Sequence, residues 1–301
     1  MTNPTILLTG GSGFVAGSII RQATDAATWH VVTRGDKLHS APHLHWYRAD
    51  IAAEHAIETL IGYLRPSAVI HTAALADIDY CEANQDEAWL VNAALPERIA
   101  KATAEIGARM IFCSTDTVFD GSRGNYTEDD APNAVNFYAK TKIAAEEAVR
   151  AANANSVVAR VALVMGLPVL GKGNSFLSRM IASLEAGKDV TVPAVEIRTP
   201  IDVLTLGKAL TELATHDYCG TLHLSGSEAI NRYAMTQRIV ARLGHPVERV
   251  KANDPTNIPG RAERPRDASM NNQRAQATLS TTFCGLDEAI ERVLAFQQGE
   301  Q

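Results

Sequence analysis

A glycine-rich turn near the amino terminus constrains the fold of this chain more than any other feature. The turn reads Gly10-x-x-Gly13-x-x-Ala16, follows the apolar run Thr5 to Thr9, and opens a helical pattern from about Phe14 to Ala26. Glycines there let the chain turn tightly and bring backbone N–H groups against a pyrophosphate at the positive end of a helix. The sequence therefore predicts a strand–turn–helix unit that holds a dinucleotide, with contacts from Gly10, Ser12, Gly13, Phe14 and Val15.

Short apolar runs alternate with helical patterns through the first half of the chain. We expect strands at residues 29–33, 44–48, 67–71, 109–113 and 157–161, and helices at residues 53–64, 86–106 and 138–152. This alternation is typical of parallel βαβ units. The predicted fold class is therefore α/β, with a Rossmann-type, doubly wound parallel sheet.

Proline and glycine interrupt this pattern after about Val164. Helical patterns return at residues 203–215, 230–243 and 286–296, whereas residues 251–274 are rich in Pro, Asn and Arg, which predicts a loop near the ligand. We expect a Rossmann domain at residues 1–164. Most of residues 165–301 should form a smaller carboxy-terminal, substrate-binding lobe, with some segments returning to the Rossmann domain.

Composition and charge exclude several classes of function. Of the 301 residues, 46% are hydrophobic and 21% are charged, and the net charge is −6, which argues against disorder and against a nucleic-acid-binding surface. The first residues carry no positively charged leader, and no apolar stretch has the length of a membrane span. The four cysteines are far apart and no His or Cys cluster completes a metal set. We expect a cytoplasmic protein with free thiols and no metal.

The end of the second predicted strand bears on the choice of dinucleotide. Thr33-Arg34-Gly35 stands where an NAD enzyme would place a carboxylate for the ribose hydroxyls. A guanidinium there favours a 2′-phosphate instead. Arg34 therefore predicts a preference for NADP, with NAD as the alternative, and makes residues 1–164 an NADP-binding domain.

Further cofactor contacts are expected after the third and fourth predicted strands. Asp50 and Ile51 are placed to meet the adenine edge, and the small residues Ala73, Ala74 and Ala76 to let the cofactor lie flat. Each assignment has a structural alternative, which is a helix cap for Asp50 and core packing for the alanines.

Between the fourth and fifth predicted strands, polar side chains at two places have expected roles. Asn92 is a helix-interior amide, for which we expect contact with a water or a backbone carbonyl beside the cofactor; an exposed neutral residue is the alternative. Asp79 and Glu82 have the spacing of a capping box, which predicts a structural role at a helix start.

Tyr138 and Lys142 carry the chemistry. Their four-residue spacing places both side chains on one helix face. An ammonium beside a phenol favours the phenolate and draws the phenol pKa towards neutrality, where general acid catalysis is efficient. Lys142 is also expected to hold the nicotinamide ribose. Ser114-Thr115-Asp116 ends a strand at the sheet edge where doubly wound folds bind ligands, and the spacing does not choose between Ser114 and Thr115 as the hydroxyl donor. These residues predict a nicotinamide-dependent reductase acting on a carbonyl.

The chain resembles the extended short-chain dehydrogenase/reductases, and within them the dTDP-4-dehydrorhamnose reductase group of nucleotide-sugar enzymes. The resemblance is carried by the glycine-rich turn, His71-Thr-Ala-Ala, Cys113-Ser-Thr-Asp, Val118-Phe-Asp-Gly and Tyr138-x-x-x-Lys142. It implies Thr115, Tyr138 and Lys142 as a catalytic triad that delivers a proton while a hydride passes from nicotinamide to a 4-keto sugar. The substrate contacts it implies are Asp116, Thr117, Val118, Asn174, Arg198 and Arg264.

The chain departs from this family at three places. Thr117 stands where the family usually has Tyr, Leu163 stands near the usual position of an aromatic, and the segment from Met165 to Asn174 is longer than the usual loop. The first two positions lie where the sugar would be gripped.

Two other readings stay open at the level of the sequence. The regulatory β subunit of methionine adenosyltransferase resembles the same reductases, keeps a nucleotide cradle, and acts by binding a partner enzyme. A nucleotide-sugar epimerase or dehydratase would use the same triad with a retained NAD. A homodimer is also compatible with the chain, because the predicted helices at residues 86–106 and 138–152 have the length to pair across an interface.

Overall fold

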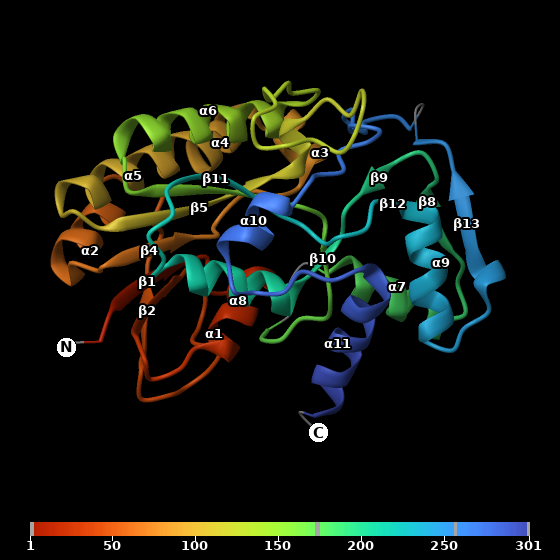
Figure 1. The fold of residues 1–301 in the computed structure, drawn as a ribbon, viewed down its shortest axis with the longest axis horizontal. Helices are drawn as coiled ribbons and strands as arrows, with labels where there is room; N and C mark the ends of the chain where they lie inside the picture. Colours follow the sequence, from red (N-terminus) through yellow and green to blue (C-terminus); the bar gives the residue numbers. More distant parts are fainter. Residues whose placement is uncertain (1–2, 172–174, 256–257, 300–301) are drawn as a thin grey trace.

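The structure is a computed structural model that describes residues 3–171, 175–255 and 258–299. Its centre is a seven-stranded parallel sheet in the order β11-β6-β5-β4-β1-β2-β3 (Figure 1). The α/β class and the doubly wound parallel sheet predicted from the sequence are confirmed. The strands are β1 (Thr5–Thr9), β2 (Thr28–Thr33), β3 (Leu44–Arg48), β4 (Ala68–His71), β5 (Arg109–Thr115), β6 (Ser156–Val161) and β11 (Gly220–Leu224).

Helices cover both faces of this sheet (Figure 1). One face carries α2 (Ala56–Leu64), α5 (Leu95–Glu105) and α6 (Phe137–Ala152), and the other carries α1 (Phe14–Gln22) and α8 (Val203–Leu213). Strand β1 shows how its sequence supports both layers: Ile6 and Leu8 join the core beneath α1 and α8, while Leu7 joins the core beneath α2 and α5. Alternate side chains of a strand point to opposite faces, so a run of apolar residues is buried on both sides.

Helix α1 is shorter than the sequence pattern suggests. It begins after Gly13 and ends at Gln22, four residues before the predicted end. The segment that follows must turn back towards the sheet, because the Thr28 N–H donates to Pro4 O and Asn3 Nδ2 donates to Asp25 O. Tertiary pairing therefore overrides the helical pattern beyond Gln22.

The single helix predicted at residues 86–106 is divided. The chain forms α3 (Ile78–Ala83), then α4 (Gln85–Trp89), a π-helical turn at Leu90–Ala94, and finally α5. The helix cap of α3 is Asp77, whose side chain accepts from Tyr80 N, so the predicted capping box on Asp79 is wrong. A π turn inserts one extra residue into a helix and is frequent at functional sites.

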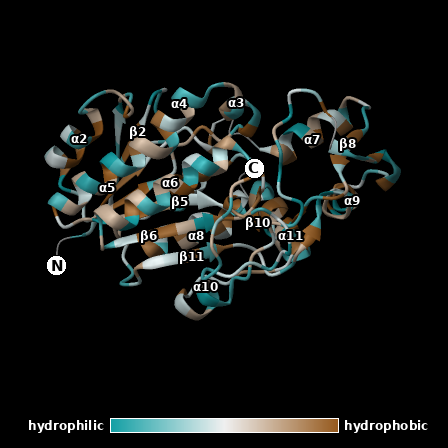
Figure 2. Ribbon diagram, turned by 90° about the horizontal axis from the view of Figure 1, so that it is seen from above, coloured by the Kyte–Doolittle hydropathy of each residue, from teal (hydrophilic) through white to brown (hydrophobic). Residues whose placement is uncertain are grey.

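Small two-stranded sheets and helices build the second lobe, which lies beyond one end of the main sheet (Figure 2). Its elements are β7 (Val164–Met165) with β10 (Ile201–Asp202), β9 (Ile197–Arg198) with β12 (Ile230–Asn231), β8 (Val190–Pro193) with β13 (Val250–Asn253), and the helices α7 (Phe176–Glu185), α9 (Arg232–Arg242) and α11 (Leu286–Gln298). Helix α10 (Gln273–Thr278) instead packs against β11 of the main sheet. Short 3₁₀ turns stand at Asp116–Val118 and Val247–Arg249.

The prediction of a loop over residues 251–274 is wrong at both ends of that range. Its first residues pair with β8 as strand β13, and its last two begin α10. Only Val250 of β13 is buried, so the strand is held by backbone pairing that an apolar pattern does not reveal. Farther back in the chain, α8 and β11 return to the main sheet, where β11 pairs with β6.

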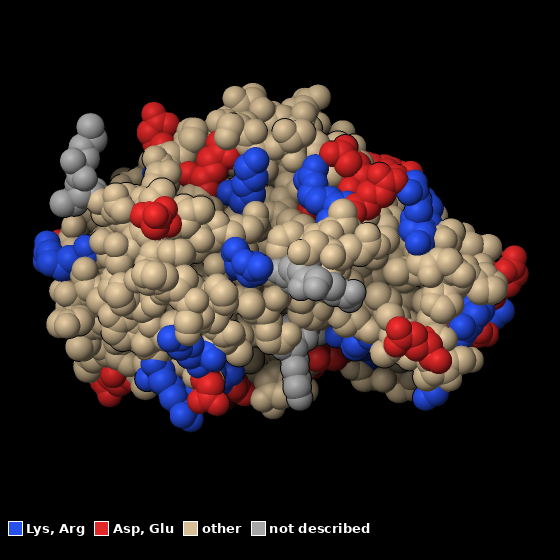
Figure 3. Space-filling view, turned by 90° about the horizontal axis from the view of Figure 1, so that it is seen from below, with Lys and Arg blue, Asp and Glu red and all other residues tan. Residues whose placement is uncertain are grey.

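The described part of the chain contains no helix that is both long and apolar enough to cross a membrane. On the face seen in Figure 3, the Lys and Arg side chains lie among Asp and Glu side chains rather than apart from them. Charges of mixed sign give that face no broad field of one sign.

Candidate active site

Helix α6 presents the Tyr–Lys pair to the carboxyl end of β5. The side chain of Asn136 caps the helix by accepting from Ala139 N, so α6 begins at Phe137, one residue before Tyr138. Tyr138 and Lys142 are both buried, at 8% and 2% exposure. Lys142 Nζ donates to Cys113 O at 2.7 Å and lies 4.2 Å from the centroid of the Phe112 ring. The ammonium is therefore held against the end of β5, on the helix face that carries the phenol.

The electrostatics of this pair differ from the sequence expectation. Burial raises the pKa of the Tyr138 phenol above its ordinary value, the charge of Asp116 adds to the rise, and the Thr115 side chain opposes it. Burial lowers the pKa of the Lys142 ammonium to about 8. The expected fall of the Tyr138 pKa caused by Lys142 is wrong for this structure, because the phenol packs in an apolar cluster with Cys81 and Ala88 while the ammonium is engaged by Cys113 O.

The structure separates the two hydroxyls that the sequence left as alternatives. Ser114 Oγ donates to Glu146 Oε1 at 2.6 Å, inside a buried network that also contains Arg160. Thr115 instead lies beside Tyr138, because a hydrogen bond between the Thr115 side chain and the phenol opposes the rise of the Tyr138 pKa. Thr115, rather than Ser114, joins Tyr138 and Lys142 in one constellation.

Asp116 and Thr117 extend this constellation towards the second lobe. Thr115 Oγ1 lies 3.1 Å from Thr117 Oγ1 and donates to Asp116 Oδ1 at 3.2 Å. Asp116 Oδ2 lies 3.6 Å from Arg198 Nε, is buried, and has no hydrogen-bond partner among the described residues. Burial raises the pKa of the Asp116 carboxyl, with the Arg198 charge opposing that rise. A buried carboxylate oxygen with no donor is suited to accept from a substrate hydroxyl.

The glycine turn has the shape of an anion cradle. Gly10 has φ +75°, and a Cβ on it would lie 2.9 Å from Ala73 N. A Cβ on Gly11 would lie 2.4 Å from Val31 Cγ1, so neither glycine leaves room for a side chain. Gly13 caps α1 without a side-chain hydrogen bond, and Ser12 beside it is exposed. The first N–H groups of α1 thus remain available for a phosphate, and Phe14 and Val15 are half-buried beside them.

The other predicted cofactor residues surround this cradle at the ends of β2, β3 and β4. Arg34 is exposed directly after β2. Asp50 is exposed after β3, and its Oδ1 accepts from Ala52 N, which is a local turn and not a helix cap. Ile51 is buried, Ala73 is half-buried beneath the glycine turn, and Ala74 and Ala76 are exposed.

Asn92 fixes the loop that follows β4. The side chain lies in the π-helical turn, is 1% exposed, and makes two hydrogen bonds with the backbone of Leu75: Oδ1 accepts from Leu75 N and Nδ2 donates to Leu75 O, both at 2.9 Å. The expected backbone contact is present, and the exposed alternative is wrong. Asn92 orients the loop that carries Ala73, Ala74 and Ala76.

The candidate substrate residues have different surroundings. Thr117 and Val118 are buried in the 3₁₀ turn after β5. Arg264 forms a two-point ion pair with Asp79, at 2.5 and 2.9 Å, and this pair explains why Asp79 is not a helix cap. The pairing lowers the pKa of the Asp79 carboxyl. Asn174 lies outside the described residues.

Sequence reasoning missed Arg232 at the start of α9. Its guanidinium lies over the Phe176 ring, 5.3 Å from the centroid, and lines a cavity of about 250 Å³ between α7, β8 and α9. Its Nε is buried without a hydrogen-bond partner in the described part of the chain. No motif marks this arginine, and its only sequence signal is a basic residue directly after the helix-capping residue Asn231.

A glycine cradle at the start of α1 and a buried Tyr–Lys pair against the end of β5 define the extended short-chain dehydrogenase/reductase class. The chain belongs to the RmlD substrate binding domain family, whose model matches residues 4–298. The resemblance stated from the sequence is thereby confirmed.

Relatives of two kinds are similar to the chain. Methionine adenosyltransferase 2 subunit beta of Bos taurus is 29% identical over 280 residues, covering 91% of this chain and 82% of the relative. A dTDP-4-dehydrorhamnose reductase of Mycobacterium tuberculosis is 33% identical over 223 residues, covering 71% of each. Among solved structures, dTDP-4-dehydrorhamnose reductase from Bacillus anthracis in complex with NADP superposes with a TM-score of 0.86 at 22% identity, covering 98% of this chain and 99% of that one.

Proposed function

We propose that the protein is an NADP-dependent reductase of a 4-keto nucleotide sugar, similar to dTDP-4-dehydrorhamnose reductase. The observation that carries this proposal is the convergence of Thr115, Tyr138 and Lys142 at the carboxyl end of β5. Residues 1–164 would hold the cofactor and most of residues 165–301 the substrate. The relative from Mycobacterium tuberculosis and the NADP complex from Bacillus anthracis support the same reading.

The residues present fit an NADP cofactor. Gly10 and Gly13 keep the pyrophosphate position free of side chains, and Arg34 offers a guanidinium where a 2′-phosphate would lie. NADPH, when bound, supplies the hydride that the carbonyl carbon accepts. NAD is the alternative cofactor, because exposed Arg34 does not by itself obstruct a ribose hydroxyl.

The chain's own residues supply and control the proton. The raised pKa of Tyr138 keeps the phenol protonated at neutral pH, so it can donate to the carbonyl oxygen and leave an alcohol. Lys142, with a pKa of about 8, is mainly charged at pH 7, and its ammonium at the end of β5 would hold the nicotinamide ribose. Thr115 is the second hydroxyl available to the carbonyl oxygen, and Asp116 accepts from a neighbouring sugar hydroxyl.

The cavity beside Arg232 is the proposed place for the nucleotide of the substrate. Phe176, Met180 and Val192 give it apolar walls, and the half-buried Arg232 gives it a cation. An aromatic ring with a cation above it suits the planar base and the phosphates of a nucleotide. Arg198 is the proposed link to the sugar, because its Nε lies 3.6 Å from Asp116 Oδ2 and its strand β9 pairs with β12, which leads into Arg232.

A turnover assay tests the proposal. The purified protein is supplied with NADPH and dTDP-4-dehydrorhamnose, and the loss of NADPH absorbance is recorded. Tyr138→Phe should lower kcat/KM by roughly 10²- to 10⁴-fold, the usual contribution of a general acid. Tyr63→Phe is the matched control, because Tyr63 is an exposed tyrosine of α2. Undiminished turnover in Tyr138→Phe would remove Tyr138 from the mechanism.

A regulatory subunit is the second candidate. The match to methionine adenosyltransferase 2 subunit beta spans 91% of the chain, and Thr117 and Leu163 depart from the family at the proposed sugar grip. Under this reading the protein binds NADPH without turning over keto sugars and associates with a methionine adenosyltransferase catalytic subunit. Co-purification of the two proteins, with no NADPH oxidation on a panel of 4-keto nucleotide sugars, would select this candidate. Cofactor that co-purifies as NAD and is not consumed would select an epimerase or dehydratase instead.

We also propose that a homodimer forms through the faces of α4, α5 and α6. Tyr80, Trp89 and Leu90 are exposed near the start of this helical layer, at 43%, 48% and 44%. Light scattering of the wild type and of Trp89→Lys tests this, since a charged side chain in the interface would shift a dimer to monomer.

A further inference from the structure

A buried carboxylate stands on the helix face that carries Tyr138 and Lys142. Glu146 follows Lys142 by four residues of α6, about one helical turn, so the two side chains share a face. Glu146 is fully buried, at 0% exposure. Moving a carboxylate from water into the protein interior costs free energy, so a side chain in this position needs partners there.

The partners of Glu146 come from two neighbouring strands of the main sheet. Ser114 Oγ of β5 donates to Glu146 Oε1 at 2.6 Å. Arg160 of β6 donates to the carboxylate from Nε at 3.1 Å and from Nη2 at 2.8 Å. Arg160 is itself buried, at 2% exposure, and its guanidinium lies 5.1 Å from the centroid of the Phe119 ring. The carboxylate therefore connects α6 to both strands in the interior of the protein.

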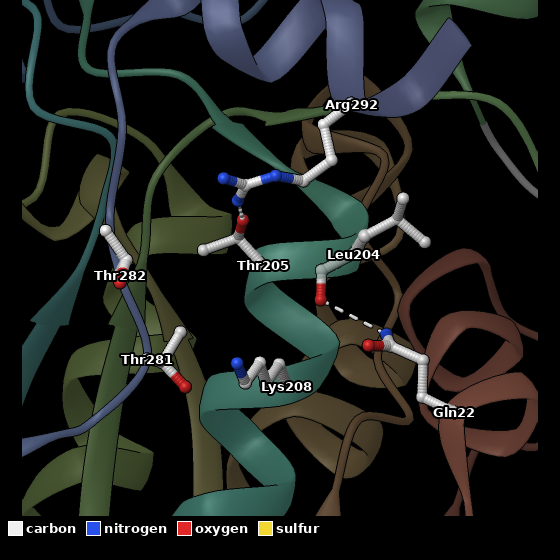
Figure 4. Close-up of a pocket in the computed structure, with 7 residues that line it drawn as sticks. All are labelled: Gln22, Leu204, Thr205, Lys208, Thr281, Thr282 and Arg292. Carbon is white, nitrogen blue, oxygen red and sulfur yellow. Dashed lines mark hydrogen bonds between the residues drawn. The ribbon is translucent and has the colours of Figure 1, made fainter. Parts of the chain in front are cut away.

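An ion pair elsewhere in the molecule shows by contrast how enclosed this one is. Arg292 of α11 lies 3.6 Å from Asp202 Oδ2 and donates to the Thr205 hydroxyl of α8, beside a cavity of about 350 Å³ (Figure 4). The Arg292 side chain is 32% exposed and also pairs with Glu288 at 2.8 Å, so water and a second carboxylate share its charge. That pair joins two helices near the surface, whereas the pair on α6 is shut off from water.

The geometry that the buried pair imposes matters more than its energy. A buried ion pair contributes little net stability, because the desolvation of both charges offsets their attraction. Three consecutive residues at the end of β5 meet three side chains of one face of α6. The contacts are Thr115 with the Tyr138 phenol, Cys113 O with Lys142 Nζ, and Ser114 Oγ with Glu146. The contact of Glu146 thus sets the same register between helix and strand that the Tyr–Lys pair uses.

Glu146 also supplies the negative charge next to Lys142. Burial lowers the pKa of Lys142 to about 8, and the Cys113 thiol, Glu146 and the Cys81 thiol oppose that fall. The thiols, the phenol and the imidazole around Lys142 carry no charge at pH 8, because burial raises the pKa of Cys113 to about 12, raises the pKa values of Cys81 and Tyr138, and lowers the pKa of His71 to about 3. On the other side of the balance, Arg160 and the part-exposed Arg150 bring positive charge to Glu146.

We propose that Glu146 is a positioning residue for the Tyr–Lys pair. Held by β5 and β6, it fixes the register of α6, so that the phenol reaches Thr115 and the ammonium reaches the end of β5. Its carboxylate is the counter-ion that keeps Lys142 protonated in the closed interior. Glu146 acts through Lys142 and the phenol and not by contact with the substrate. The inference rests on the proposed function for its effect on turnover, but its effect on Lys142 does not.

Urea unfolding between pH 6.5 and 10 tests the proposal without any turnover. In the wild type, the part of the stability that depends on Lys142 begins to rise near pH 8, because the folded chain loses a proton that the unfolded chain still binds. The same measurement in a Lys142→Met background is subtracted to isolate this rise. Glu146→Gln keeps an acceptor for Ser114 but removes the charge, so the rise should begin about one pH unit lower. Arg160→Gln leaves the carboxylate without its main counter-ion, so the rise should begin at a higher pH.

The opposite directions distinguish a charged positioning residue from a loosened core. A loosened core would admit water and move the Lys142 pKa towards its ordinary 10.5 in both variants. Glu288→Gln, which removes a carboxylate from the ion pair of α11, is the matched control and should leave the onset at the wild-type pH. Where a single variant does not fold, the double variant of Glu146→Gln with Arg160→Gln leaves no unpaired charge, and its onset should also lie below that of the wild type. The proposal is overturned if removal of the Glu146 charge leaves the onset unchanged or raises it.

Turnover then connects this residue to the reaction. With NADPH and the keto sugar over the same pH range, Glu146→Gln should lower kcat about 10-fold through misplacement of the phenol. The alkaline limb of its rate profile should move to lower pH together with the onset in unfolding. An unchanged kcat with an unchanged alkaline limb would overturn the positioning role. A wild type that does not turn over would refute the proposed function instead, and the unfolding comparison would still decide whether Glu146 holds Lys142 in its charged form.

Discussion

Replacing the buried lysine of the Tyr–Lys pair should make the protein more stable while making it inactive. In the folded protein, burial lowers the pKa of Lys142 from its ordinary 10.5 to about 8. At about 1.4 kcal/mol for each pH unit, the charged lysine costs the folded state about 3 kcal/mol at neutral pH. Lys142→Met removes this cost. It also leaves Cys113 O without its donor, which costs about 1–2 kcal/mol, so the net gain should be about 1–2 kcal/mol.

The sign of this effect depends on pH in a defined way. Below the folded pKa of about 8, Lys142 is protonated in both the folded and the unfolded chain, and the whole penalty is present. Between about 8 and 10.5 the unfolded chain binds the proton that the folded chain has lost, so the stability of the wild type rises with pH. The advantage of Lys142→Met should therefore be largest at pH 7 and should shrink as the pH approaches 10.5.

Urea unfolding of the two proteins, at several pH values between 6.5 and 10, measures this difference. Lys101→Met, on the exposed surface of α5, is the control and should follow the wild type at every pH. Reductase activity in the same preparations should be lost in Lys142→Met only. A Lys142→Met protein that is less stable than the wild type at pH 7, or a gain that is the same at every pH, would refute the reasoning, because the cost would not then come from the buried charge.

Three further changes test the cofactor cradle and its support. Arg34→Asp should shift the ratio of kcat/KM values from NADPH towards NADH by about 10- to 100-fold, and an unchanged ratio would show that Arg34 does not meet the 2′-phosphate. Gly10→Ala places a Cβ 2.9 Å from Ala73 N at a residue with φ +75°, so it should weaken NADPH binding in fluorescence titrations and lower stability by about 1–3 kcal/mol, whereas wild-type affinity would contradict a tight cradle. Asn92→Ala should cost about 2 kcal/mol in urea unfolding, because it leaves two backbone groups of the loop after β4 without partners; a cost near zero would mean that water replaces the amide.

The elements with a strong apolar pattern are the ones the sequence predicts well. Strands β1 and β3 have the predicted bounds, since their ends coincide with the glycine turn and with polar residues. The spacing of Tyr138 and Lys142 likewise predicted a shared helix face, and both side chains are buried on α6, where Lys142 reaches the end of β5. Their catalytic role stays a prediction. The choice of Thr115 over Ser114 needed the structure, because only the packing of Glu146 against β5 reveals that Ser114 is engaged.

Long-range pairing explains most of what the sequence could not provide. Asp79 has the spacing of a helix cap, but its carboxylate is held by Arg264, which lies 185 residues away. Arg232 belongs to no motif, and its position over Phe176 depends on how α7 and α9 pack. The direction of the Tyr138 pKa was missed because a burial effect cannot be read from the spacing of two residues on a helix.

The return of β11 to the sheet has a consequence for any attempt to cut this protein into pieces. All six residues of β6 are buried, and β11 provides the row of backbone partners along its outer side. A fragment that stops at residue 164 would leave the apolar strand β6 as an exposed edge strand with unpaired backbone groups. Such an edge readily pairs with strands of other molecules. Such a truncation should precipitate rather than yield a separable nucleotide-binding half.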